Sequence, residues 1–130
     1  MDFTLELDKK QLEKIEQILE EELIELGVQN VILIDLAGNV IVNLDNGKIN
    51  HDVYSLAALA AGNFGAVSAM ANIIGEQEFS LLFHKGETDS IHFSKVSDDL
   101  LLITIFSKDV SLGFLRLKVN EANRKIQEML

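Results

Sequence analysis

Histidines and aspartates are the residues of this chain whose types could support metal or acid–base chemistry. His84 and His92 fall on adjacent strands of a predicted hairpin, but the sequence holds no close histidine pair, no third ligand in register and no cysteine. Asp35 and Asp45 could form a carboxylate pair, yet each stands in a turn, where aspartate has a structural use. We therefore expect no metal, no cofactor and no active site in this chain.

The segment "AGNFGA" at residues 61–66 could be taken for a phosphate-binding loop. It lacks the Gly-Lys-Ser/Thr ending of such loops and falls inside a predicted helix, so close helix packing explains its glycines better. Asn63 would lie on the bulky side of that helix, buried and hydrogen-bonded. The only arginines, Arg116 and Arg124, stand outside this helix, near the C-terminus. We therefore expect that the protein alone neither binds nor hydrolyses nucleotides.

Composition limits the remaining possibilities. The 130 residues carry a formal net charge of -10 and the sequence pI is about 4.6, which disfavours binding to nucleic acid or anionic lipid. A hydrophobic content of 48% supports a single domain, residues 1–130, with a real core. The acidic opening "MDFTLELDKK" is not a secretory signal, so we expect a cytoplasmic protein.

Hydrophobic periodicity predicts the elements that would position these residues. Helical spacing favours amphipathic helices near both ends of the chain and an uncharged helix in the middle. A turn with Asp35 and Gly38 in its first and fourth positions joins the first two strands, and short loops join the last three. The order αββαβββα indicates an α+β fold, a five-stranded antiparallel sheet with helices on both faces. The expected helices are 9–26, 53–75 and 112–129, and the expected strands lie within 31–47, 79–85, 90–96 and 100–106.

The middle helix, "VYSLAALAAGNFGAVSAMANIIG", shows no charge to solvent. On a helical wheel its bulky residues gather on one half, which we expect to cover the sheet, and its small residues gather on the other. Gly62 and Gly65 each cost about 1 kcal/mol relative to alanine inside a helix, which indicates that another backbone approaches closely. The bulky half consists of Val53, Leu56, Leu59, Phe64, Val67, Met70, Ile73 and Ile74.

Three environments could accept such a helix: a membrane, the interior of the domain, or the surface of another molecule. Its length would allow a membrane span, but weak hydrophobicity and the missing basic or aromatic flanks argue against insertion. Burial inside one domain would require a third layer, while the terminal helices are needed on the opposite face. We therefore favour a homodimer in which two such helices meet.

The stretches "LAALAAGNFGAVSAMANIIGE", "GETDSIHFSKVSDDLLLITIF" and "SLGFLRLKV", with the order of elements, resemble the Roadblock family and most closely its bacterial MglB-like members. The resemblance covers Leu12 to Val119. It implies a Roadblock/profilin-like fold and a homodimer whose sheet continues across the two chains through the strand around Phe79 to His84. Pairing there would also remove an apolar edge, "FSLLF", that would otherwise promote aggregation.

Bacterial members of the family bind a small Ras-like, MglA-like GTPase across the paired helices and promote GTP hydrolysis. The resemblance therefore implies a GTPase-activating regulator without an active site of its own. The alternatives are a scaffold or adaptor dimer and a small-molecule sensor, which would need a roomy pocket between sheet and helix. The residues implied in the dimer or partner interface are Tyr54, Ala58, Ala61, Gly62, Gly65, Ser68, Ala69 and Asn72 on the helix and Phe79, Leu81 and Phe83 at the sheet edge.

Overall fold

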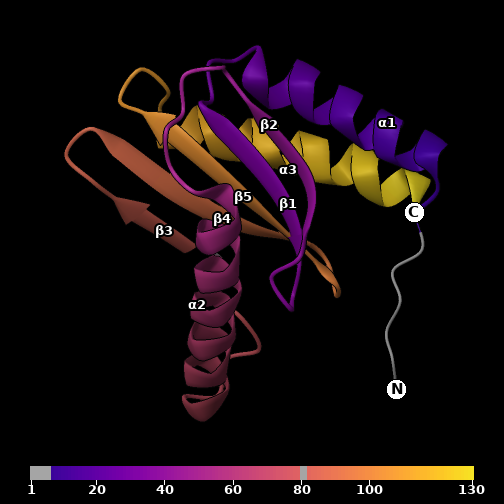
Figure 1. The fold of residues 1–130 in the computed structure, drawn as a ribbon. Helices are drawn as coiled ribbons and strands as arrows, with labels where there is room; N and C mark the ends of the chain where they lie inside the picture. Colours follow the sequence, from indigo (N-terminus) through magenta and orange to yellow (C-terminus); the bar gives the residue numbers. More distant parts are fainter. Residues whose placement is uncertain (1–6, 80–81) are drawn as a thin grey trace.

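The computed structural model describes residues 7–79 and 82–130, and within them it confirms the predicted order of elements (Figure 1). The helices are α1 (Lys9–Leu19), continued by the π-helical turn η1 (Glu20–Ile24), α2 (Val53–Ile73) and α3 (Leu112–Met129). The strands are β1 (Asn30–Asp35), β2 (Val40–Asp45), β3 (Leu82–Lys85), β4 (Asp89–Ser97) and β5 (Leu100–Ser107). The α+β fold class is therefore confirmed.

One antiparallel sheet holds the five strands in the order β2-β1-β5-β4-β3. Side chains of β5 alternate between the two faces, as the period of a strand requires. Leu100 and Leu102 pack toward one core cluster, while Leu101 and Ile103 pack toward the other. The sheet is therefore apolar on both faces, and each face needs a helical cover.

The helices divide between these two faces. Figure 1 shows α1 and α3 side by side on one face, with α2 alone on the other. Leu19 of α1 and Leu115 of α3 are fully buried in the first cluster, and Val53 of α2 belongs to the second. The C-terminal half of α2 extends past the sheet, which leaves much of that helix without cover from its own chain (Figure 1).

The first helix begins where the sequence predicts and changes geometry before its predicted end. Asp8 caps it, because its carboxylate accepts a hydrogen bond from the Gln11 N–H at 2.8 Å and its own N–H donates to the Gln11 side chain at 3.0 Å. The α-helix ends at Leu19, and the predicted remainder continues as the π-helical turn η1. On η1, Glu22 accepts a hydrogen bond from Lys125 of α3 at 2.7 Å, so this turn is tied to the neighbouring helix.

The turn between β1 and β2 packs closely against α2 at a glycine. Gly38 has a φ of 92°, and a Cβ there would lie 3.1 Å from Ala58 Cα on α2, whereas Gly47, with a φ of 80°, has open space around it. We expect Gly38→Ala to lower the free energy of unfolding by at least about 1 kcal/mol more than Gly47→Ala, because both strain the backbone but only Gly38→Ala crowds α2. Urea unfolding of the two variants measures the difference, and equal losses would contradict this packing.

Candidate interaction surface

The side chain of Asp52 caps the start of α2. The Asp52 carboxylate accepts hydrogen bonds from the Tyr54 N–H at 3.0 Å, the Ser55 N–H at 3.2 Å and the Ser55 hydroxyl at 2.8 Å. These bonds, the one from the Ser55 hydroxyl above all, lower the pKa of Asp52 below its usual value. A charged N-cap also suits the positive end of the helix dipole.

A buried amide anchors the loop that leads into α2. Asn30 on β1 is fully buried, and its Nδ2 donates to Asn43 Oδ1 and to the Leu44 carbonyl, each at 2.8 Å. Its Oδ1 must then be an acceptor, so the His51 Nε2 that lies 2.8 Å away carries a proton and donates. His51 therefore has a structural role in holding the helix entrance.

The orientation of α2 on the sheet differs from the prediction. Its buried residues are Val53 and three alanines, Ala57, Ala60 and Ala71. The helix is thus rotated by about a quarter turn from the expected orientation, at 100° per residue. The expectation that the whole bulky half covers the sheet is wrong, because alanines let the helix approach the broad side chains of the sheet, such as Phe93.

The rotation leaves two different surfaces of α2 exposed. On one side are Leu59, Met70, Ile73 and Ile74, which are 73%, 53%, 82% and 68% exposed and which we call the bulky stripe. On the other side are Ala58, Gly62, Gly65, Ala69 and Asn72, all exposed, which we call the small stripe. Hydrophobicity is nearly uniform around this helix, so the sequence offered no signal that could have identified the bulky stripe as exposed.

Most, but not all, of the predicted helix residues belong to this exposed surface. Tyr54 is 74% exposed at the N-terminal end of the small stripe. Ala61 and Ser68 are less exposed than the others, because both are half-buried. Ala61 packs on the second core cluster and therefore turns toward the sheet. The prediction for Asn63 is wrong, because this side chain is exposed. No Cβ-sized obstacle within the described residues lies near Gly62 or Gly65, so these glycines make no close contact in this chain.

The sheet edge is the second predicted part of the interface. β3 is an edge strand, and Phe83 on it is half-buried and stacks on Phe106 with ring centroids 6.0 Å apart. Phe79 precedes the strand and is 38% exposed. Leu81 lies outside the described residues. The described part of β3 thus offers an unpaired strand edge to a partner.

The histidines form no metal site within the described residues. No group of three or more His, Asp or Glu side chains there is arranged to hold a metal ion. His84 is exposed and lies edge-on to Phe93, at 5.9 Å between ring centroids, whereas His92 is buried on the opposite face of the sheet. The two rings that the sequence placed on adjacent strands therefore point away from each other.

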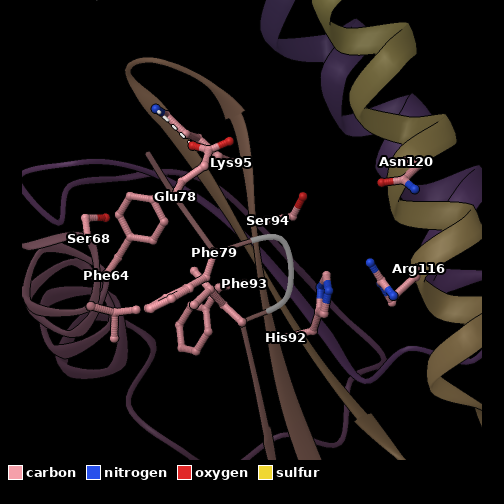
Figure 2. Close-up of a pocket in the computed structure, with 12 residues that line it drawn as sticks. Phe64, Ser68, Glu78, Phe79, His92, Phe93, Ser94, Lys95, Arg116 and Asn120 are labelled. Atoms are coloured by element: carbon pink, nitrogen blue, oxygen red, sulfur yellow. Dashed lines mark ion pairs between the residues drawn. The ribbon is translucent and has the colours of Figure 1, made fainter. Parts of the chain in front are cut away.

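Polar side chains gather at a small pocket between β4 and α3. The pocket has a volume of about 170 Å³, and its lining includes His92 and Ser94 of β4 and Arg116 and Asn120 of α3. Figure 2 shows the strand and helix side chains facing each other across a gap, with an aromatic wall that includes Phe64 toward α2. Burial, and then the charge of Arg116, lower the pKa of His92 to about 4.

By length and mean hydropathy (1.4), α2 is also the one helix among the described residues that could cross a membrane. Only 17% of its apolar window is buried. One such helix is weak evidence for a membrane span, because core helices pass the same test.

With this geometry in place, comparison with known proteins identifies the family. The family model described as "Roadblock/LC7 domain" matches residues 14–106. The chain belongs to the Roadblock/LC7 family. No curated protein sequence is a significant match.

Among solved structures, this Roadblock/LC7 chain is similar to MglB over nearly its whole length. Myxococcus xanthus MglB is 31% identical with a TM-score of 0.86, covering 96% of this chain and 93% of that one. The gliding protein MglB from Thermus thermophilus is 28% identical with a TM-score of 0.86, covering all of both chains. A structure described as MglB with tetrameric arrangement is 27% identical with a TM-score of 0.86, covering 97% and 94%.

More distant structures share the fold alone. Profilin IA from Acanthamoeba castellanii is 15% identical with a TM-score of 0.60, covering 88% of this chain and 98% of that one. This likeness confirms the profilin-like arrangement of sheet and helices.

Proposed function

We propose that this protein is a cytoplasmic, homodimeric regulator that stimulates GTP hydrolysis by a Ras-like, MglA-like GTPase. The observation that carries the proposal is the uncharged, exposed surface of α2, which extends past the sheet in a chain of net charge -10 (Figure 1). An apolar surface of this kind marks an interaction site in a protein of this size. The family resemblance and the similarity to MglB support a GTPase as the partner.

The two stripes of α2 lie on different sides of the molecule. Leu56, which belongs to the same flank of the helix as the bulky stripe, lines a groove with His84 and Ile91 of the β3–β4 hairpin. Ala58 of the small stripe lies instead against Gly38 in the β1–β2 turn. The bulky stripe is therefore on the side of the open edge at β3, and the small stripe is on the opposite side.

We propose that each of the two partners binds one stripe. A second copy that paired with β3 would bring its own α2 toward the bulky stripe, so edge pairing and burial of large apolar side chains would occur in one interface. The small stripe would stay uncovered on the outer flank of each helix. We assign it to the GTPase, whose switch loops could approach the helix backbone closely over its alanines and glycines.

The arginines support a mechanism in which the partner supplies the catalytic groups. The Arg124 guanidinium donates to Glu121 at 2.6 Å and to Glu128 at 2.7 Å, so it is held on the surface of α3. Arg116 also belongs to α3, in the layer across the sheet from α2. Neither arginine stands where a GTPase on the small stripe would present its phosphates. We propose that the regulator holds the switch loops in a productive arrangement.

GTP hydrolysis by a purified MglA-like GTPase tests the proposal. Wild-type protein should raise the hydrolysis rate, and Ala69→Asp in the small stripe should reduce that stimulation at least tenfold, because a carboxylate would be desolvated at the docked surface. Leu117→Asp, at a position that is 62% exposed on α3, is the control and should keep it. Stimulation that survives Ala69→Asp but is lost in Arg116→Ala would instead indicate an arginine finger.

The scaffold alternative gives a different result in a binding assay. A regulator must bind the GTP-loaded and GDP-loaded forms of its partner with different affinity, because a ligand shifts an equilibrium only through differential affinity. A scaffold would bind both forms equally. Calorimetry with each nucleotide form therefore distinguishes the two functions, and equal affinities without stimulation of hydrolysis would refute the proposed one.

A further inference from the structure

The pocket between β4 and α3 contains polar groups that the proposed regulatory role does not use. Arg116 and Asn120 stand one helical turn apart on α3, and the polar ends of His92 and Ser94 face them from β4 (Figure 2). The lining also includes Ser68 of α2, but no residue of either stripe. A function for these four side chains is therefore distinct from the contact that we propose for the small stripe.

His92 is a buried ring with unused capacity for hydrogen bonds. It is 4% exposed, and its Nδ1 has no hydrogen-bond partner among the described residues. Buried polar atoms are nearly always paired in native proteins, so an orphan beside a pocket indicates a missing partner. The ring is neutral near pH 7, since its pKa lies at about 4, and one of its nitrogens then carries a proton to donate.

Arg116 contributes a positive charge to the same pocket. Unlike Arg124, which binds two glutamates, Arg116 forms no ion pair with any described residue. A guanidinium presents several N–H donors in a planar arrangement that matches carboxylate and phosphate oxygens.

The rest of the lining adds little charge. Glu78, the acidic residue of the lining, lies 3.8 Å from Lys95, which also lies 3.6 Å from Asp98. Asn120 can donate from its amide, and Phe64 and Phe93 supply an apolar wall. The volume of about 170 Å³ is well below the 300 to 1,000 Å³ of sites for drug-sized ligands, so a ligand here must be small.

We propose that this pocket binds a small oxyanion, a carboxylate or a phosphate group, with Arg116 as its charged anchor. Asn120 and the protonated nitrogen of His92 supply neutral donors to the same group.

Binding of inorganic phosphate and of acetate to the full chain tests this site. Two-dimensional amide NMR spectra are recorded during titration with sodium phosphate, sodium acetate and, at equal ionic strength, sodium chloride. We expect saturating shifts of the signals of His92, Arg116 and Asn120 with phosphate, with acetate or with both, and none with chloride. The two oxyanion titrations show which group the pocket prefers.

Two matched arginine variants complete the test. Arg116→Gln should weaken oxyanion binding at least tenfold, whereas Arg124→Gln, on the same helix, should leave it unchanged. Asn120→Ala, at an exposed position, should weaken it by a smaller factor and guards against a folding defect in Arg116→Gln. Shifts that do not saturate, that also appear with chloride, or that persist in Arg116→Gln would overturn the proposal.

Discussion

Met70→Asp should convert the proposed homodimer into monomers at micromolar concentration. Met70 is 53% exposed in the single chain, in the bulky stripe on the side of β3. In a two-fold interface each of the two chains contributes one substituted residue, so two carboxylates would be buried. An unpaired buried carboxylate costs about 3 to 5 kcal/mol. We therefore expect the dissociation constant of the dimer to rise at least 100-fold. Light scattering behind a sizing column measures the change.

Ala69→Asp is the matched control for this experiment. Ala69 precedes Met70 on the same exposed part of α2, so the two substitutions lower the stability of the helix by a similar amount. Ala69 belongs to the small stripe, and Ala69→Asp should leave the dimer intact while it reduces stimulation of the GTPase at least tenfold. A wild-type monomer, or dissociation by Ala69→Asp and not by Met70→Asp, would contradict our assignment of the stripes.

Acidification below pH 6.5 should destabilise the protein through His92. The folded state holds the pKa of His92 at about 4, below the ordinary value of 6.5, so the unfolded chain binds the proton more tightly. The stabilisation is complete above pH 6.5 and is lost as the pH falls toward 4. For a ring that is 4% exposed, this difference corresponds to about 3 kcal/mol of unfolding free energy. Urea unfolding at a series of pH values, at one protein concentration, measures it.

The window between pH 6.5 and 4.5 isolates this effect. Asp52 and Glu121 have lowered pKa values, so their contributions are lost only below their ordinary values of 3.8 and 4.5. The charged groups that line the His92 pocket are Arg116, Lys95 and Glu78. His92→Gln should remove most of the slope, and His84→Gln, at an exposed ring, should retain it. Wild-type stability that is constant across this window would refute the prediction.

Local sequence signals were sufficient for the order of the elements and for the start of each helix. Asp8 and Asp52 each cap a helix at the position where a short acceptor precedes an apolar run. The turn at Asp35 forms as predicted, with the Gly38 N–H donating to the Asp35 carbonyl at 3.1 Å. These features depend on residues within a few positions of one another, so one sequence contains all the information they need.

The orientation of α2 and the two sites around it were decided by tertiary structure. A helix that is apolar all round has no preferred buried side of its own. Its orientation therefore depends on the shape of the sheet surface, against which Ala57 and Ala60 are buried while Leu59 and Met70 stay in solvent. Likewise, His92 and Arg116 stand 24 positions apart in the sequence, and only the packing of α3 on β4 places them at one pocket. The sequence by itself determined which segments form helices and strands and where the helices begin. Only the tertiary structure decided which of their surfaces remain free to bind, because that choice depends on the shapes of surfaces built from distant parts of the chain.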